Sequence, residues 1–205
     1  MGWFHQNTAY STSRPRSASL AVEQLETRDL LSAATFAVAT GIVNSTESHR
    51  DFVTQEYQAF LGRNPDANGL QTWVGALNAG AAPEVVEARI VSSQEYINDH
   101  GGNPTLWLTG LYNNLLGRAP DAVGLNVWLN ALAVGFTPGQ VALAFTTSAE
   151  REAIIITNDY VNFLGRAPAL SEVNVWLFFE AQGNDRAQVV AQVLASNEFF
   201  SDHSN

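Results

Sequence analysis

The chain contains no cysteine and no lysine, and it has no long hydrophobic run. Without cysteine it forms no disulfide, binds no metal through thiolates and has no cysteine nucleophile. All ten basic residues are arginine, against 20 acidic residues, and the formal net charge is −10. The longest apolar stretch, residues 33–43, is interrupted by threonine and glycine and is too short to cross a bilayer. We therefore expect no transmembrane segment.

The net negative charge comes entirely from the second part of the chain. Residues 1–44 carry three arginines and three acids, whereas residues 45–205 carry seven arginines and 17 acids. Such a surface repels the phosphate backbone of nucleic acids and the anionic surface of membranes. The charge thus argues against a nucleic-acid partner and favours cations, or partners that carry positive charge.

One motif occurs three times, beginning at Tyr57, Tyr112 and Tyr160. Every copy continues with a Gly-Arg pair, a proline and a tryptophan, and the first two copies add an aspartate and a second glycine. We interpret these positions as structural: Tyr57, Gly62, Arg63, Asp66, Gly69, Trp73, Tyr112, Gly117, Arg118, Asp121, Gly124, Trp128, Tyr160, Gly165, Arg166 and Trp176. A repeat of this length predicts a tandem array whose units bury apolar faces against one another.

A Ser-x-Glu signal marks where each unit begins. It starts at Ser45, Ser93, Ser148 and Ser196, and serine ahead of an acid is typical of a helix N-terminus. We therefore predict a helical repeat domain over residues 45–205, with units at 45–92, 93–147 and 148–195 and a capping turn at 196–205. The middle unit is seven residues longer because residues 99–104 contain Gly-Gly and proline, which interrupt helices. Residues 1–44 are expected to be a disordered targeting segment with a short helix at Leu20–Ser32.

Apolar spacing predicts three helices in each unit. The first helix carries a stripe such as Val53, Tyr57 and Phe60 and ends at the motif glycine, a left-handed cap. The second begins at the motif aspartate, and the third begins near Pro83 or Pro138, where proline suits the first helical turn. No stretch shows the alternation of a strand. We predict an all-α fold of three tandem three-helix units of about 48 residues, stacked into one compact helical array.

The repeated motif resembles the bacterial domain-of-unknown-function family 4214, over roughly residues 45–205. This resemblance implies a helical domain of exported and surface-layer-type proteins, often beside calcium-binding or carbohydrate-active modules, with no established catalytic residue. The Tyr…Leu-Gly-Arg…Pro-Asp core is more loosely similar to phycobilisome linker domains, which are scaffolds. Residues 22–33 resemble an N-terminal segment of exported proteins from budding aquatic bacteria, which implies a secreted or cell-surface location.

Three motif positions leave a functional alternative open. The arginines after the cap glycine either pair with an internal carboxylate or form a bidentate clamp for an anionic ligand. Asp66 and Asp121 either cap the second helices or contribute to a calcium site. The motif tryptophans either fill the core or provide stacking platforms for sugars. The residues do not decide between these readings, although a position that recurs in every unit favours a structural role.

Two regions differ between units and are candidate partner surfaces. In the third unit the motif aspartate becomes Ala169, the motif glycine becomes Glu172 and a core leucine becomes Glu180. These changes predict a weaker helix start, and they indicate either a terminal face turned to water or a partner surface of Phe178, Phe179 and Glu180. Trp107, which follows the insertion of the middle unit, is the other candidate.

No set of residues has the spacing of a catalytic or metal site. The four histidines are scattered, and no nucleophile elbow or phosphate-binding loop is present. We therefore predict no enzyme and no cofactor, with calcium as the one alternative. The predicted protein is a secreted or cell-envelope helical repeat module that acts as a scaffold or protein-binding unit. The alternative is a carbohydrate-binding accessory domain, so that the partner is a protein or a polysaccharide of the envelope; a buried Trp107 would count against the latter.

Overall fold

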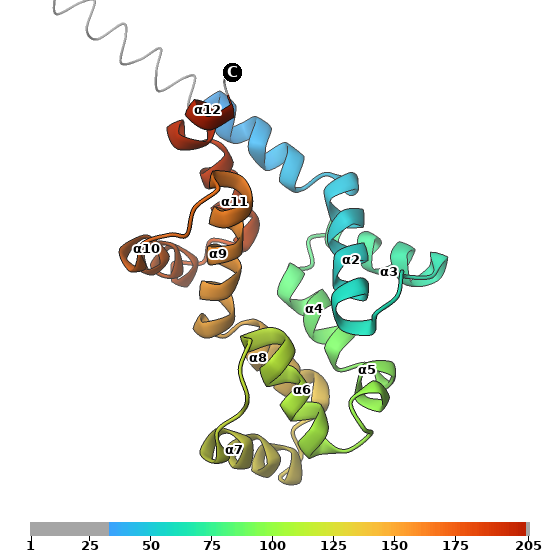
Figure 1. The fold of residues 1–205 in the computed structure, drawn as a ribbon. Coiled ribbons are helices and arrows are strands. Elements are labelled where there is room, and N and C mark those ends of the chain that lie inside the picture. The colour runs from blue at the N-terminus through green and yellow to red at the C-terminus, as the bar shows by residue number, and fades with distance from the viewer. Residues whose placement is uncertain (1–32, 204–205) are drawn as a thin grey trace, which may run out of the picture.

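The computed structural model describes residues 33–203, in which helices and short connections are the only elements. The prediction of an all-α fold is confirmed. A helix over residues 33–43 is followed by eleven helices (Figure 1): α2 (Thr46–Leu61), α3 (Ala67–Asn78), α4 (Pro83–Val91), α5 (Gln94–Asp99), α6 (Pro104–Leu116), α7 (Ala122–Ala133), α8 (Pro138–Thr146), α9 (Ala149–Leu164), α10 (Leu170–Ala181), α11 (Arg186–Leu194) and α12 (Asn197–His203).

Local signals in the sequence explain most of the helix ends. Ser45, Ser93 and Ser148 each accept a backbone N–H three residues ahead, at the starts of α2, α5 and α9. The first helices end at Gly62, Gly117 and Gly165, which have φ of 62°, 64° and 64°. That left-handed conformation is strained for any residue with a Cβ, so glycine is favoured there.

The insertion of the middle unit divides its first helix into two pieces. Units one and three have a single 16-residue helix, α2 or α9, where unit two has α5 and α6. Gly101 and Gly102 lie between the two pieces with φ of 83° and 66°, and Asn103 caps the start of α6. The short α5 turns back onto α6. At the end of α5 the His100 ring stacks on Tyr96 of the same helix, with 4.0 Å between ring centroids.

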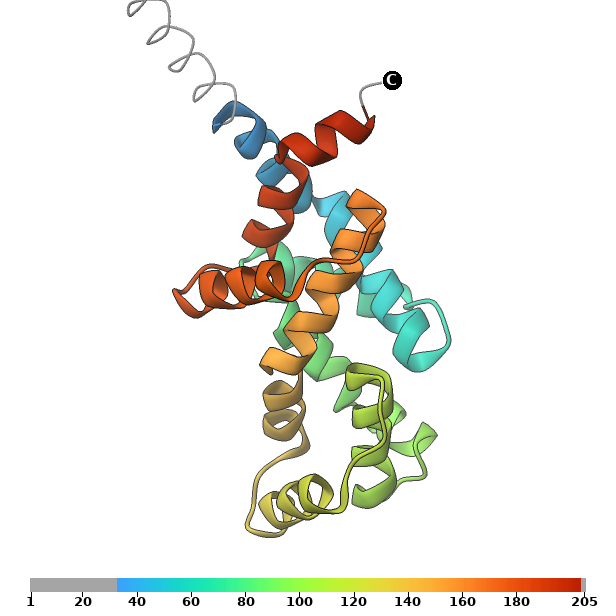
Figure 2. The ribbon, with the colours of Figure 1, turned by 60° about the vertical axis from the view of Figure 1, so that its left-hand side comes forward.

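The array contains two separate apolar cores. Units one and two share the larger core, and their third helices, α4 and α8, form the most extensive helix contact in the described chain. Unit three has its own core around Ile156 and Tyr160. It joins unit two chiefly through α9, which contacts α6 and α8. The second helices, α3, α7 and α10, lie at three outer corners of the molecule (Figures 1 and 2).

The helix over residues 33–43 was not predicted. It lies at the same end as α12, opposite α7 (Figures 1 and 2). The predictions made for residues 1–32, including the short helix at Leu20–Ser32, fall outside the described residues. Within residues 33–203, no helix combines the length and hydropathy that a membrane span requires.

Candidate functional site

In all three units the repeated motif joins the first helix to the loop that follows it. The Arg63 guanidinium lies 5.1 Å from the centroid of the Tyr57 ring, and the other two Arg–Tyr pairs are 5.0 and 5.1 Å apart. Trp73 Nε1–H donates to the Tyr57 hydroxyl at 3.1 Å, and Trp176 donates to Tyr160 at 2.8 Å. The motif tryptophans are half-buried against the cores, so they serve as internal contacts between the first and second helices.

The motif arginines pair with the Ser-x-Glu acids of the following unit. Arg63 donates to both oxygens of Glu95, at 2.5 and 2.6 Å, and Arg118 donates to Glu150 at 2.5 and 2.9 Å. Arg166 pairs with Glu198 in the same way. Each acid lies 32 residues after its arginine. The guanidinium lowers the pKa of Glu95, Glu150 and Glu198, and the fork is occupied by an internal carboxylate.

Asp66 and Asp121 cap the second helices of units one and two. Asp66 accepts the Gly69 N–H at 2.9 Å, and Asp121 accepts the Gly124 N–H at 2.8 Å. These backbone hydrogen bonds lower the pKa of both carboxyl groups. Among residues 33–203 no three His, Asp or Glu side chains come together in a way that could hold a metal ion.

The glycine of the motif leaves room for the tyrosine hydroxyl. A Cβ built at Gly69 would lie 2.7 Å from Tyr57 Oη, and one at Gly124 would lie 2.5 Å from Tyr112 Oη. Both tyrosines are buried, so their rings have little freedom to move away. Elsewhere in α3, a Cβ at Gly75 would meet nothing within 4 Å.

These two glycines predict opposite effects of the same substitution in one helix. Gly75→Ala is expected to raise the free energy of unfolding by about 0.5–1 kcal/mol, because alanine is the better helix former. Gly69→Ala is expected to lower it by about 1–3 kcal/mol through overpacking against Tyr57. Urea denaturation followed by circular dichroism measures both changes. Equal changes in the two variants would contradict the assigned role of Gly69.

In the third unit Ala169 stands in place of the aspartate cap and Glu172 in place of the motif glycine. The Glu172 carboxylate accepts the Ala169 N–H at 2.7 Å and pairs with Arg166 at 2.8 and 2.9 Å. Hydrogen bonds from Arg166 and then Ala169 lower the pKa of Glu172 to about 2. The donor differs from that of the aspartate caps, because Asp66 accepts the N–H three residues ahead whereas Glu172 accepts the N–H of the N-cap residue itself. The third second-helix start thus lacks a side-chain cap on its first turn, in line with the weaker start that the loss of aspartate predicts, and the hydrogen bond from Ala169 offsets only part of this loss.

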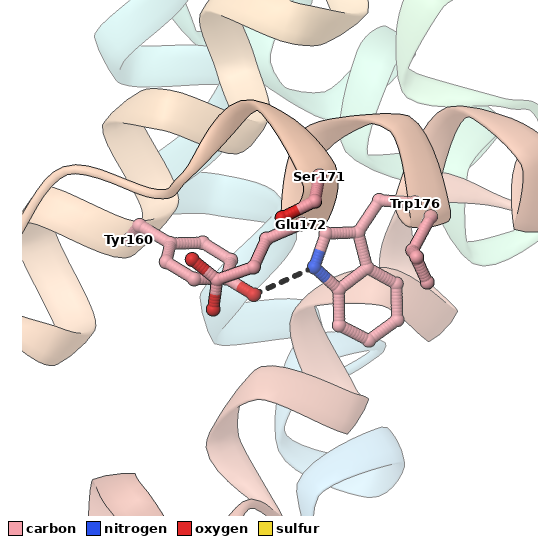
Figure 3. Close-up of a pocket in the computed structure, with 5 residues that line it drawn as sticks. Tyr160, Ser171, Glu172 and Trp176 are labelled. Carbon is pink, nitrogen blue, oxygen red and sulfur yellow. Dashed lines mark hydrogen bonds between the residues drawn. The ribbon is translucent and has the colours of Figure 1, made fainter.

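Glu172 also lines a shallow hollow that includes two motif aromatics. The hollow has a volume of about 200 Å³ and is lined by Tyr160, Ser171, Glu172, Val175 and Trp176 (Figure 3). Figure 3 shows the Glu172 carboxylate next to the Tyr160 ring, with the Trp176 indole hydrogen-bonded to the tyrosine hydroxyl. The Tyr160, Trp176 and Glu172 polar atoms have internal partners, so the hollow offers ring edges, a paired carboxylate and the exposed Ser171 hydroxyl.

The prediction that Trp107 forms a partner surface is wrong. Trp107 is 2% exposed, and its Nε1–H donates to the Val91 carbonyl at 2.8 Å. It lies on α6 one turn before Leu111, so it shares the face that packs into the core of units one and two. This face directs Trp107 inward, against the end of α4, and the residue is not available to stack on a sugar.

Of the three residues predicted as a surface on α10, only Phe178 is on the outside. Phe178 is 68% exposed. Phe179 packs edge-on against Trp176, with 6.0 Å between ring centroids, and belongs to the core of unit three. Glu180 is half-buried and interacts electrostatically with Glu152 and Arg186. The helix turns these neighbours inward, and the exposed apolar residues beside Phe178 are Leu170 and Val175.

A second exposed apolar face was not predicted. Val123, Val127 and Val134 follow one stripe of α7, Phe136 comes just after it, and all four are more than half exposed. Their counterparts in unit one, at the same distances from the motif glycine, are Asn68, Thr72, Ala79 and Ala81. The helix has no charged residue. An alignment of the repeats would have revealed this face, because polar or small residues at the equivalent positions of unit one indicate that these positions do not belong to the core.

Comparisons with known proteins agree with the repeat. The family pattern described as Domain of unknown function (DUF4214) matches twice, at residues 30–100 and 87–155. The third copy of the motif, which lacks the aspartate and the second glycine, lies beyond the two matches. Neither a curated protein nor a solved structure matches the chain. The two matches together cover more than half of the sequence, and the chain therefore belongs to the DUF4214 family.

Proposed function

We propose that this protein is a non-enzymatic helical repeat module of the bacterial cell surface that binds a protein partner through the outer faces of its second helices. The observation that carries this proposal is the exposed apolar side chains on α7 and α10. Val127 on α7 and Phe178 on α10 are exposed to solvent. The equivalent positions of unit one hold the polar Thr72 and the small Gly75. Exposed apolar patches with a polar surround are typical of protein interaction sites.

The repeated motif itself supports a scaffold role. Its tryptophans, arginines and aspartates are engaged in contacts within or between units. A ligand would have to break these contacts to bind the motif. The exposed residues that differ between the units are therefore better candidates for partner specificity than the motif residues that the units share. The cell-surface location rests on the resemblance of residues 22–33 to export segments.

A co-sedimentation experiment with cell envelopes of the producing bacterium tests the proposal. The full chain is expected to sediment with untreated envelopes and to stay in solution after the envelopes have been treated with protease. The variant Val123→Asn/Val127→Thr, which copies the residues of α3, and the variant Phe178→Ser are expected to weaken binding. Asn126→Ala, an exposed change on α7, is the matched control. Loss of binding in the control alone, or no binding to envelopes at all, would refute the proposal.

The same experiment addresses the carbohydrate alternative, which the hollow beside Trp176 favours. Aromatic edges beside a carboxylate and a hydroxyl are the groups that sugar sites use. Three results together would support this second function. Binding would survive protease treatment of the envelopes, it would be lost when envelope polysaccharide is oxidised, and it would be weakened by Ser171→Val rather than by the α7 variant. A repeat in the presence of chelator reports whether calcium contributes.

A further inference from the structure

The interface between the third unit and the first unit is made of charged side chains rather than apolar ones. The two apolar cores are separate. Between them lie side chains from α2, α4, α9, α10 and α11, which we call the charged seam: Glu56, Glu84, Glu87, Arg151, Glu152, Asp159, Glu180 and Arg186. Six carboxyl groups share two guanidinium groups, so the two arginines cannot neutralise all of them.

The two arginines hold the seam together across the units. Arg186 on α11 donates to Glu152 at 2.6 and 3.2 Å, and a Glu84 oxygen on α4 lies 3.7 Å from its guanidinium. Arg151 on α9 pairs with Glu87 of α4 and donates to the Leu115 carbonyl at 3.1 Å. The third unit therefore reaches the first unit through ion pairs that are largely buried.

Four carboxyl groups in the seam have an oxygen that is buried and has no hydrogen-bond partner. These groups are Glu56, Glu87, Asp159 and Glu180. A buried carboxylate without a partner is unfavourable, and binding a proton removes the charge. Glu87 pairs with Arg151 through its other oxygen, so the geometry favours the protonated form of Glu56, Asp159 and Glu180 whenever the seam is closed.

The repeat supplies an internal reference for this arrangement. Glu56 and Asp159 each lie six residues before the glycine that ends the first helix, and Leu111 occupies this position in unit two. Leu111 is fully buried in the core. Glu180 likewise occupies the position of Leu77 and Leu132. Acids thus replace core leucines on the units that face each other across the seam.

We propose that the charged seam is a proton-dependent contact, which holds the third unit against the first when Glu56, Asp159 and Glu180, the carboxyl groups without an arginine partner, are protonated, and which opens as these three ionise. Burial raises the pKa of Glu56 and Glu87 above the ordinary value of 4.5. Burial likewise raises the pKa of Asp159 to about 6 and that of Glu180 to about 7, the latter with a contribution from the Glu152 charge.

The sign of the effect follows from these directions. A carboxyl group with a raised pKa in the closed state binds its proton more tightly there than in the open state. The closed seam is therefore favoured at acidic pH, and this preference is lost as the pH rises through the raised pKa values of Asp159, Glu180 and Glu56, about 6, about 7 and about 8. The inter-unit acids Glu95 and Glu150 have lowered pKa values. They titrate below this window and do not contribute to the change.

Hydrogen exchange of the full chain at pH 5.5 and pH 8, corrected for the intrinsic pH dependence of exchange, tests the proposal. Protection of amides in α9 and α11 is expected to fall roughly tenfold or more between the two values, since one pKa unit corresponds to a factor of ten. Amides of α6, in the other core, are expected to keep their protection. Unchanged protection in α11, or an equal loss in α6, would overturn the proposal.

Two variants identify the groups responsible. Glu180→Gln and Glu56→Leu, the latter copying Leu111, each remove one titrating group. Each is expected to reduce the pH dependence and to give higher protection at pH 8 than the wild type has there. The control Glu47→Gln/His49→Gln removes an exposed acid and a histidine near the start of α2 and is expected to behave as the wild type. A pH dependence of undiminished size in both seam variants, or one that is abolished by the control, would contradict the proposal. If Glu56→Leu fails to fold, Glu180→Gln alone decides.

Discussion

Replacing Trp107 by alanine is expected to lower the free energy of unfolding by about 3–5 kcal/mol, the usual effect of deleting a large aromatic side chain from a core. Trp107 is 2% exposed and packs in the core that units one and two share. The change also leaves the Val91 carbonyl without its indole donor. Urea denaturation followed by circular dichroism measures the loss.

Two further variants separate the contributions at this position. Trp107→Phe retains most of the apolar area but not the hydrogen bond, so a smaller loss of about 1–2 kcal/mol is expected. Leu106→Ala changes the neighbouring residue, which is 50% exposed, and is expected to cost less than about 1 kcal/mol. A loss for Trp107→Ala no larger than that for Leu106→Ala would show that the tryptophan does not belong to the core.

Replacing Arg186 by alanine is expected to destabilise the third unit by about 3–5 kcal/mol at pH 8, because it leaves a buried carboxylate without its partner. Arg186 is the common partner of Glu152 and Glu84, and Glu152 is itself buried. The loss is expected to be smaller at pH 5.5. Arg186 opposes the upward shift in the pKa of Asp159 and Glu180, so without it these groups hold their protons more tightly.

The location of this loss is as informative as its size. Hydrogen exchange is expected to accelerate in α9 and α11 of the Arg186→Ala variant and to stay slow in α6, because the two cores are separate. Arg50→Ala, at an exposed position on α2, is the control and is expected to change neither region. A uniform acceleration in all three helices would show that the array unfolds as one unit and that Arg186 has no special role at the seam.

Arg63 and Trp107 illustrate how far sequence reasoning reached in this protein. The pairing of the motif arginine with an internal carboxylate was one of the sequence alternatives, and the structure identifies that carboxylate for Arg63 as Glu95, 32 residues later. Trp107 was misplaced because it was grouped with the insertion, although it lies ten residues before the cap glycine, as Phe52 and Ile155 do. Phe52 packs against the core of units one and two, so the repeat does show which face this position takes. A helix face can be read from periodicity only when enough positions on it are apolar.

The α7 stripe and the charged seam show a second kind of error. Val123 and Val127 look like ordinary helix residues, and Glu56 looks like a solvated acid, because a sequence pattern does not state what lies opposite a given face. The position of Glu56 is buried in the middle unit as Leu111. Comparing the repeats shows that this position is a core position. Only the structure shows that in unit one it faces another unit.

The sequence by itself determined the helices, their caps and the repeat. These features depend on residues three or four apart, and Ser45, Asp66 and Gly62 act on backbone groups within one turn of the chain. Only the tertiary structure decided that the three units form two cores, and that α4 packs on α8 while charged groups of α4 meet α9 and α11. Packing between units depends on which faces approach each other across long separations in the chain, and many residues at once set that choice.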